Sequence, residues 1–163
     1  MLTKLRARAT EYAFAWMGVV FALGGTVFLL HLTAHPWLLA SFGGSCVILF
    51  GMADTEMAQP RSFLGGHLVS TVVGLVFLRL GWAHFGGSPT IWAVAATATA
   101  LVLMMITRTI HSPAGANPIV VFAENAGWSF FVAPLLIGLV VLFVSAYLVN
   151  NRGRGGRYPR TWH

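Results

Sequence analysis

The chain has 163 residues, for which we expect one compact unit. Hydrophobic residues make up 57% of it and charged residues only 9%, whereas a soluble domain is about 25% charged. This composition excludes a soluble protein, because too few polar side chains are present to cover a surface in contact with water. The net charge is +6, and the basic residues gather near the two ends of the sequence. Because Lys and Arg are retained on the cytoplasmic side, we expect both ends in the cytoplasm and no nucleic-acid-binding face.

Apolar stretches long enough for membrane helices follow one another along the chain, since such a helix needs about 20 apolar residues. We expect helices at residues 12–32, 37–53, 62–80, 90–107 and 129–149. The first stretch is too long for the apolar region of a signal peptide, so we interpret it as a membrane span. Residues 110–125 are too rich in Pro and polar side chains for a helix that faces lipid. The basic, Gly-rich residues 150–163 are expected to form a solvated cytoplasmic tail.

An internal repeat explains the unusual segment. Residues 41–50 (SFGGSCVILF) align without gaps on residues 113–122 (PAGANPIVVF), with Ser45 opposite Asn117. Each copy lies between two long apolar helices. The sequence therefore predicts an all-α membrane protein, a helical bundle of two pseudo-repeats of about residues 12–80 and 90–149. Each half has a short or broken central helix, which gives about six membrane segments. The alternative is a tight helix contact through small residues, without any repeat.

Charge suggests how often the chain crosses the membrane. With both ends on one side the number of crossings is even, and six crossings place Arg61 and Arg108 on the cytoplasmic side. Halves of three segments would then be inverted repeats, as in many transporters. Four full spans with two re-entrant segments would also be even, but would move both arginines to the outer side. We therefore prefer six crossings.

Broken helices in a bilayer are costly unless their free backbone groups line a cavity or pack inside the protein. The N-terminus of such a helix offers unpaired N–H groups and a positive dipole to an anion. Glycines in both copies of the repeat would keep side chains away from a bound group, and polar residues beside them could donate hydrogen bonds. A kink required only for packing explains the same residues equally well. The predicted anion-binding residues are Gly43, Gly44, Ser45, His111, Ser112, Pro113, Gly115 and Asn117.

Two motifs resemble a known family. The stretch His111-Ser-Pro-Ala-Gly-Ala-Asn-Pro118 resembles the signature of the HPP family of small integral membrane proteins, usually His-Pro-Pro-Ala-Gly-Ala. Residues 43–50, followed by Ala58-Gln-Pro-Arg61 and Gly65-Gly-His67, are similar to a second block of that family. Ser112 stands in place of the first proline, which weakens any role for a rigid Pro-Pro turn. The resemblance implies nitrite transport.

The residues and the resemblance agree on a small monovalent anion, for which we expect a transporter or channel. Such an anion needs preorganised donors rather than full counter-charges, which would bind too tightly to release it. His111 is the candidate for coupling to protons, because an unperturbed histidine has a pKa near 6.5. The alternative is a structural histidine hydrogen-bonded beside a turn.

Four further residues are predicted to support the site: Gln59, Arg61, His67 and Arg108. The two arginines could attract anions by their positive potential. Anchoring at the membrane surface explains Arg108 as well, and a salt bridge with Asp54 or Glu56 explains Arg61. An ionisable residue inside a span, such as His67, is a functional candidate by default, although a neutral histidine is easily hidden between helices.

Other classes of function remain open. A haem or electron-carrier subunit could use His67 together with His31. His31 and His35 form the one histidine pair with i, i+4 spacing. A structural protein could pack its Gly-rich faces against partner helices. We expect no enzyme, since there is no Gly-x-Ser-x-Gly elbow and no pair of carboxylates within a span. The single cysteine, Cys46, lies in an apolar run, so we expect no disulfide framework and no cysteine metal site. For an anion transporter we also expect no bound metal and no cofactor.

The expected setting is the inner membrane of a bacterium, because the sequence has no Arg- and Ser-rich transit peptide. We expect a homo-oligomer, since so small a bundle needs neighbours.

Overall fold

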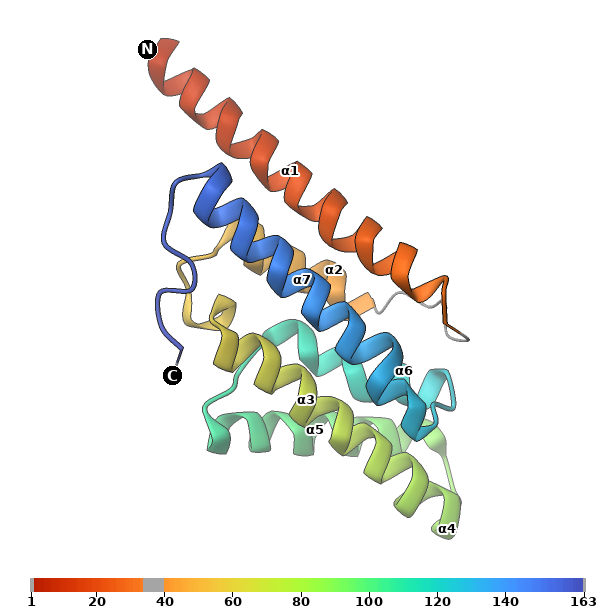
Figure 1. The fold of residues 1–163 in the computed structure, drawn as a ribbon. Helices are drawn as coiled ribbons and strands as arrows, with labels where there is room; N and C mark the ends of the chain where they lie inside the picture. The colour runs from red at the N-terminus through yellow and green to blue at the C-terminus, as the bar shows by residue number, and fades with distance from the viewer. Residues whose placement is uncertain (1, 34–39, 163) are drawn as a thin grey trace.

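The computed structural model describes residues 2–33 and 40–162, and within these ranges all regular structure is helical (Figure 1). Four helices are long and apolar enough to cross a membrane: Arg8–Leu30, Pro60–Phe85, Pro89–Thr107 and Trp128–Gly153. A shorter apolar helix covers Ala40–Gly51. The prediction of an all-α membrane bundle is therefore confirmed. Of the predicted helix at 37–53, residues 37–39 lie outside the described ranges, as does His35.

The main helices are α1 (Leu2–Leu30), α2 (Ala40–Cys46), α3 (Pro60–Val76), α4 (Ala83–Phe85), α5 (Pro89–Thr107), α6 (Asn117–Ala123) and α7 (Ile137–Leu148). Turns of π-helix extend them at Val47–Gly51, Phe77–Trp82, Val132–Leu136 and Val149–Gly153. Short 3₁₀ turns cover Glu56–Ala58, Ser112–Ala116 (η4) and Trp128–Phe131. Prolines begin α3 and α5. The first residues of a helix have no intrahelical partner for their N–H groups, so a proline costs no hydrogen bond there.

Two arginines mark the two ends of the bundle. At the start of α3, Nη2 of Arg61 donates to the carbonyl of Thr107, the last residue of α5, at 2.9 Å. Beyond the other end of α3, Nε of Arg79 donates to the carbonyl of Ala126, which lies between α6 and α7, at 2.8 Å. We call these the Arg61 end and the Arg79 end.

Within the described ranges, the long helices and the short segments run between these two ends. α1 begins at the Arg61 end, where Arg154 donates to the Glu11 carbonyl at 3.2 Å, and runs to the opposite end (Figure 1). The chain must therefore cross back before α3 begins. The chain between Thr107 and Ala126 also joins the two ends. A re-entrant segment would return to the end from which it entered, so these connections fit six crossings better than two re-entrant segments, and the number of crossings stays a prediction.

The two halves of the chain run in opposite directions. α1, α2 and α3 occupy the first half, and α5, α6 and α7 the second. The most extensive helix pairings are α3 with α5 and α1 with α7. If each helix is replaced by its counterpart in the other half, α1 by α5 and α3 by α7, one pairing becomes the other. This is the arrangement that an inverted repeat predicts. The repeat itself, with its boundaries, stays a prediction.

Aromatic rings from the first short segment pack on glycines of the long helices. The ring of Phe42 in α2 occupies the place that a Cβ on Gly138 of α7 would take. The ring of Phe50 does the same at Gly18 of α1. Both rings are fully buried in the main core. Small residues at such contacts let membrane helices approach closely, which holds the short segment between α1 and α7.

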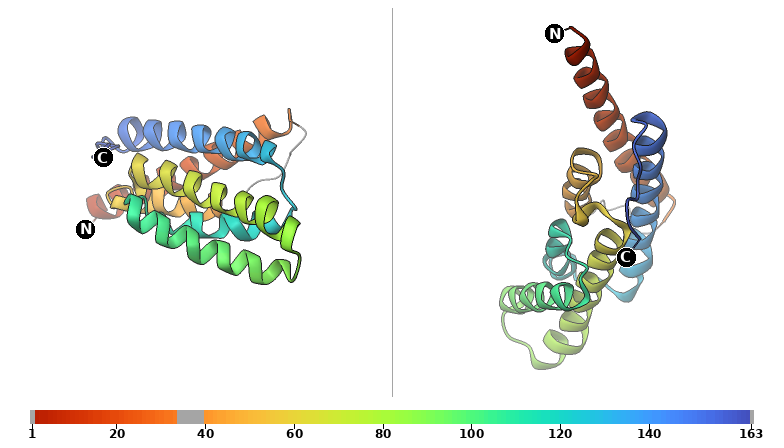
Figure 2. Two further views of the ribbon diagram at one scale, coloured as in Figure 1. Left: turned by 90° about the horizontal axis from the view of Figure 1, so that it is seen from below. Right: turned by 90° about the vertical axis from the view of Figure 1, so that its left-hand side faces the viewer.

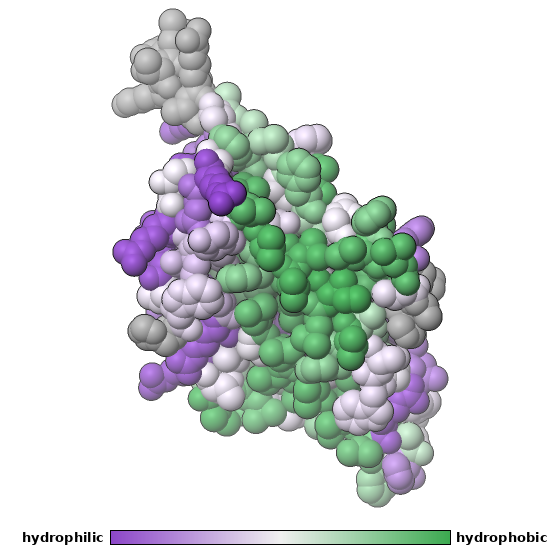
Figure 3. Space-filling view, viewed as in Figure 1, coloured by the Kyte–Doolittle hydropathy of each residue, from purple (hydrophilic) through white to green (hydrophobic). Residues whose placement is uncertain are grey.

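The outer surface fits a lipid environment. Figure 3 shows apolar side chains across the middle of the face seen in Figure 1, with hydrophilic residues gathered toward its two ends. On the last span, Val132, Val140 and Val144 are 59%, 61% and 48% exposed. Exposed branched apolar side chains in such numbers are favourable against hydrocarbon and unfavourable against water.

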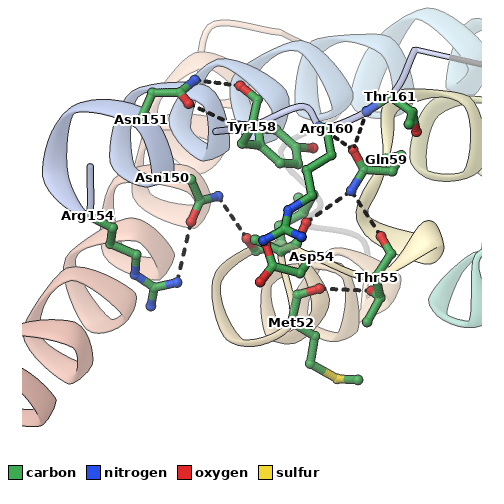
Figure 4. A network of polar contacts seen from close by, with 12 residues as sticks. Met52, Asp54, Thr55, Gln59, Asn150, Asn151, Arg154, Tyr158, Arg160 and Thr161 are labelled. Atoms are coloured by element: carbon green, nitrogen blue, oxygen red, sulfur yellow. Dashed lines mark hydrogen bonds and ion pairs between the residues drawn. The ribbon is translucent and has the colours of Figure 1, made fainter. Parts of the chain in front are cut away.

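Most residues of the C-terminal tail are exposed, as a solvated tail predicts, but Tyr158 docks into the bundle (Figure 4). Tyr158 is 3% exposed, and its hydroxyl donates to the Ala58 carbonyl at 2.7 Å. Oε1 of Gln59 accepts from the backbone N–H of Arg160 at 2.8 Å, and the guanidinium of Arg160 pairs with Asp54 at 2.6 Å. Burial raises the pKa of the Tyr158 phenol above its ordinary value. The tail is therefore attached to the Arg61 end of the bundle through Tyr158 and Arg160.

Removing this hydroxyl tests the docking. The variant Tyr158→Phe is expected to lose about 1 kcal/mol of stability, because the Ala58 carbonyl loses its donor. The raised pKa means that the folded state holds the phenol proton more tightly than the unfolded state. Wild-type stability should therefore fall as pH rises above about 10, and its advantage over the variant should shrink. Thermal unfolding in detergent at pH 7 and above pH 10 measures both effects. Equal stabilities at pH 7 would contradict the docking.

Candidate functional site

The two copies of the predicted repeat meet inside the bundle. α2 packs against η4, and a Cβ on Gly44 would lie 3.1 Å from Cβ of Pro113. The right-hand view of Figure 2 shows α2 and α6 on the same side of the molecule, between α1 and α5. The absence of a side chain on Gly44 thus allows the two short segments to touch.

The imidazole of His67 is held between the two matched positions of the repeat. Its Nε2 lies 2.8 Å from Oγ of Ser45, and its Nδ1 lies 3.0 Å from Nδ2 of Asn117. The same Nδ2 donates to Oγ1 of Thr71 at 2.8 Å. The residues from α2, α3 and α6 thus meet in one hydrogen-bonded cluster. His67, predicted only to support the site, lies at its centre.

A second histidine joins the cluster through the same hydroxyl. Nε2 of His111 lies 2.9 Å from Oγ of Ser45, and its Nδ1 lies 2.8 Å from the carbonyl of Met57. The rings of His67 and His111 have centres 5.1 Å apart. We call Ser45, His67, His111 and Asn117 the buried polar cluster.

A pair of glycines in α3 makes room for His111. A Cβ on Gly65 would lie 2.6 Å from Cγ2 of Thr109, and one on Gly66 would lie 2.7 Å from the Thr109 carbonyl and 2.8 Å from Cβ of His111. The chain before η4 therefore lies directly on α3. This approach brings the ring of His111 to the same depth as that of His67.

The cluster is closed to solvent and walled by aromatic rings. All four of its side chains are 0% exposed. Phe63 has its ring centre 5.6 Å from that of His67 and 5.4 Å from that of His111, both edge to face. Phe42 contacts His67 from the other side at 5.6 Å. In such apolar surroundings each hydrogen bond is strong, and an unpaired polar group is costly.

One polar atom of the cluster has no partner. Oδ1 of Asn117 is buried and accepts no hydrogen bond in the described part of the chain, and the same holds for Oγ of Ser41 in α2. Each such atom costs about 1–3 kcal/mol, so retaining it requires an explanation beyond stability.

The binding of an anion at helix N-termini stays a prediction, and the two copies of the repeat differ in where they place the predicted residues. Gly43, Gly44 and Ser45 lie within α2, which begins at Ala40, and not at the N-terminus of a broken helix. Asn117 does begin α6, but its amide is turned toward α3. The polar groups that meet in the cluster therefore belong to side chains.

Five predicted residues lie outside the cluster: Gly43, Gly44, Ser112, Pro113 and Gly115. Gly44 and Pro113 meet each other, as described above. Ser112 is exposed, and Gly43 and Gly115 are partly exposed. A Cβ on either glycine would meet no atom within 4 Å. Side-chain volume is therefore not limited there, and the structure gives these glycines no contact with the cluster.

The predicted supporting residues, other than His67, lie at the Arg61 end. Gln59 donates to the carbonyls of Ala53 and Thr55, both at 3.0 Å, and so orders the loop before α3. Arg108, which directly follows α5, has a left-handed backbone with φ of 55° and is exposed. These residues border a cleft of about 480 Å³. It is lined by Asp54, Glu56, Gln59, Arg61, Ser62, Arg108, Arg160 and Thr161. Three arginines against two acids leave it positive.

The geometry does not favour the histidines as haem ligands. His31 is exposed after the end of α1, whereas His67 is fully buried with both ring nitrogens hydrogen-bonded. No group of three metal-ligating side chains occurs within the described ranges.

The sequence analysis missed two residues that belong to the site. Thr71 binds Asn117, and Oγ of Ser70 donates to the carbonyl of Ala114 in η4 at 2.6 Å. The signal was present, because residues three and four positions after His67 lie on the same face of a helix.

The fold and the cluster together define a polytopic helical membrane protein with a polar centre enclosed between two short helices. A family model for the transmembrane region of HPP proteins matches residues 4–159, and the chain belongs to this family. It is similar to two transmembrane proteins of Dictyostelium discoideum. One is 33% identical over 129 residues, which cover 77% of this chain and 45% of the relative. The other is 30% identical over 167 residues, which cover 97% and 53%.

The chain thus spans about half the length of these curated relatives. No solved structure matches it.

Proposed function

We propose that this protein transports small monovalent anions across the membrane, with nitrite as the first substrate to test. The observation that carries the proposal is the buried polar cluster, which lies where the two short segments cross. Polar side chains in the middle of a membrane bundle are costly and usually belong to a pathway for ions or substrates. The hydroxyl, imidazole and amide groups of the cluster have no fixed charge. An anion would bind weakly enough to leave again.

The cleft at the Arg61 end supplies a route of approach. Its excess of arginines raises the local concentration of anions. Two residues that line the cleft are close in sequence to the cluster. Ser62 directly precedes Phe63, whose ring packs against His111, and Arg108 lies three residues before His111. We infer that anions enter the protein through this cleft. We also infer that the protein lies in the inner membrane of a bacterium, with the Arg61 end facing the cytoplasm. We expect it to form a homo-oligomer there.

Uptake into vesicles tests the proposal. Purified protein in liposomes is expected to give saturable nitrite uptake above that of protein-free vesicles, with weaker competition by nitrate, formate and chloride. Protein-free vesicles are the necessary control, because nitrous acid crosses lipid by itself. No uptake of any of these anions would overturn the proposal. An absorption spectrum of the same sample would then test for haem.

A further inference from the structure

With the Asn117 amide in the orientation that the structure gives it, the hydrogen bonds of the buried polar cluster assign a position to each proton. The Met57 carbonyl only accepts, so Nδ1 of His111 carries a hydrogen. The amino group of Asn117 only donates, so Nδ1 of His67 is bare, and Nε2 of a neutral His67 carries the hydrogen. The two rings are therefore present as opposite tautomers, although both direct Nε2 at the same hydroxyl.

The hydroxyl of Ser45 completes a directed chain between the rings. It accepts the Nε2–H of His67 at 2.8 Å and donates to the bare Nε2 of a neutral His111 at 2.9 Å. The hydrogen bonds then run in one direction from Asn117 through His67, Ser45 and His111 to Met57. Both rings are neutral, and their four nitrogens all have partners.

The same atoms accommodate one further proton on His111 without moving any heavy atom. A protonated Nε2 donates to Oγ of Ser45, which has two lone pairs and so accepts from both rings. The hydroxyl hydrogen then turns to the carbonyl of Ser41, 3.0 Å away on the preceding turn of α2. The Nδ1–H of His111 stays on Met57 in both states.

His67 lacks this second state. A proton added to its Nδ1 would point at the amino group of Asn117, which is itself a donor. Accepting it would require the amide to rotate by 180°. The two rings are therefore not equivalent, although both are fully buried.

We propose that His111 is a proton-binding site at the centre of the bundle, and that the Ser45 hydroxyl turns from His111 to Ser41 when the proton binds. An N–H bond forms at Nε2 on loading and breaks on release, with no other covalent change. The use of this proton rests on the proposed function. A positive ring in apolar surroundings attracts an anion into the cluster, so one proton accompanies each anion.

The charge around His111 is consistent with this role. The other ionisable side chains on the elements packed around it are Cys46, Asp54, Glu56, Arg61, His67, Arg79, Arg108 and Tyr158. Of these, His67 contacts the ring directly, and it stays neutral in both states. The arginines at the two ends of α3 are bound to carbonyls, and Asp54 is paired with Arg160. A proton on His111 therefore adds the first charge inside the cluster.

Nitrogen-15 NMR of histidine-labelled protein in lipid tests the site without a transport assay. At high pH we expect His111 with hydrogen on Nδ1 and His67 with hydrogen on Nε2. As pH falls, His111 should become doubly protonated while His67 keeps its tautomer. Assignment through backbone correlations needs no variant to fold. A His111 that stays neutral throughout the range in which the bundle is folded, or a His67 that protonates first, would overturn the proposal.

Proton counting in vesicles tests the coupling. A pH-sensitive dye inside the vesicles should report one proton entering with each nitrite, after subtraction of protein-free vesicles. Ser45→Ala removes the hydroxyl that serves both states, and should reduce uptake driven by a pH gradient about tenfold. The matched control is Cys46→Ala, a buried neighbour outside the cluster, which should keep the wild-type ratio.

The two proposals fail differently. Nitrite uptake without accompanying protons would overturn the coupling and leave anion transport standing. Absence of any anion uptake, with His111 protonated in the NMR titration, would overturn transport and coupling while the proton site stands.

Discussion

Replacing Asn117 by leucine is expected to lower anion uptake about a hundredfold or more while the protein still folds. The amide donates to Nδ1 of His67 and to Oγ1 of Thr71, and leucine fills similar space without either bond. Nδ1 of His67 and Oγ1 of Thr71 would each lose a hydrogen-bond donor, and each unpaired group costs about 1–3 kcal/mol. Because about 1.4 kcal/mol corresponds to a tenfold change in rate, the loss of both bonds is expected to lower uptake about a hundredfold or more. The measurement is initial nitrite uptake into proteoliposomes at equal protein content.

Two companion variants separate a local effect from misfolding. Thr71→Val keeps the shape of the side chain and removes one partner of the amide, so uptake should fall about tenfold. Ile119→Leu changes an exposed residue of the same helix and should behave as wild type. Normal transport by Asn117→Leu would show that the cluster is not on the anion pathway.

Gly66→Ala is expected to destabilise the protein by about 1–3 kcal/mol. The new Cβ would lie 2.7 Å from the Thr109 carbonyl and 2.8 Å from Cβ of His111. The backbone at Thr109 cannot turn away from the new methyl group as a flexible side chain could. The segment before η4 must therefore move away from α3. His111 would then lose its contact with Ser45, and uptake should fall with stability.

The matched control for this variant is Gly24→Ala. Gly24 also lies within a long helix, but a Cβ there would meet no atom within 4 Å. Alanine favours helix by about 1 kcal/mol relative to glycine, so this variant should be as stable as wild type or slightly more stable. Thermal unfolding in detergent compares the two. Equal unfolding midpoints for Gly66→Ala and Gly24→Ala would contradict the close contact at His111.

The repeat alignment predicted more of the site than any single motif. It paired Ser45 with Asn117, and the structure places these two residues on opposite nitrogens of one histidine. The alignment could not indicate which histidine, because His67 lies outside both copies. His67 was recognised only as an ionisable residue inside a span, and its central position depends on how α3 packs between the short segments.

The glycines of the first copy lie elsewhere in their helix than the sequence predicted, for a local reason. The glycines of the first copy were taken as the start of a helix, whereas α2 already begins at Ala40. Glycine in a membrane helix is common where another helix comes close, and Gly44 meets Pro113 in this way. A sequence pattern does not distinguish a glycine that ends a helix from one that allows a contact.

The sequence by itself determined that this is a membrane protein of long apolar helices with two short polar interruptions. Those features depend on hydropathy and chain length, which are local properties. The tertiary structure alone decided that Ser45 meets two histidines 22 and 66 residues away, and that the tail packs on the Arg61 end. Such contacts depend on which helix faces which and at what depth. The free energy that selects them comes from burial and hydrogen bonding between segments, and this information is not contained in any one segment.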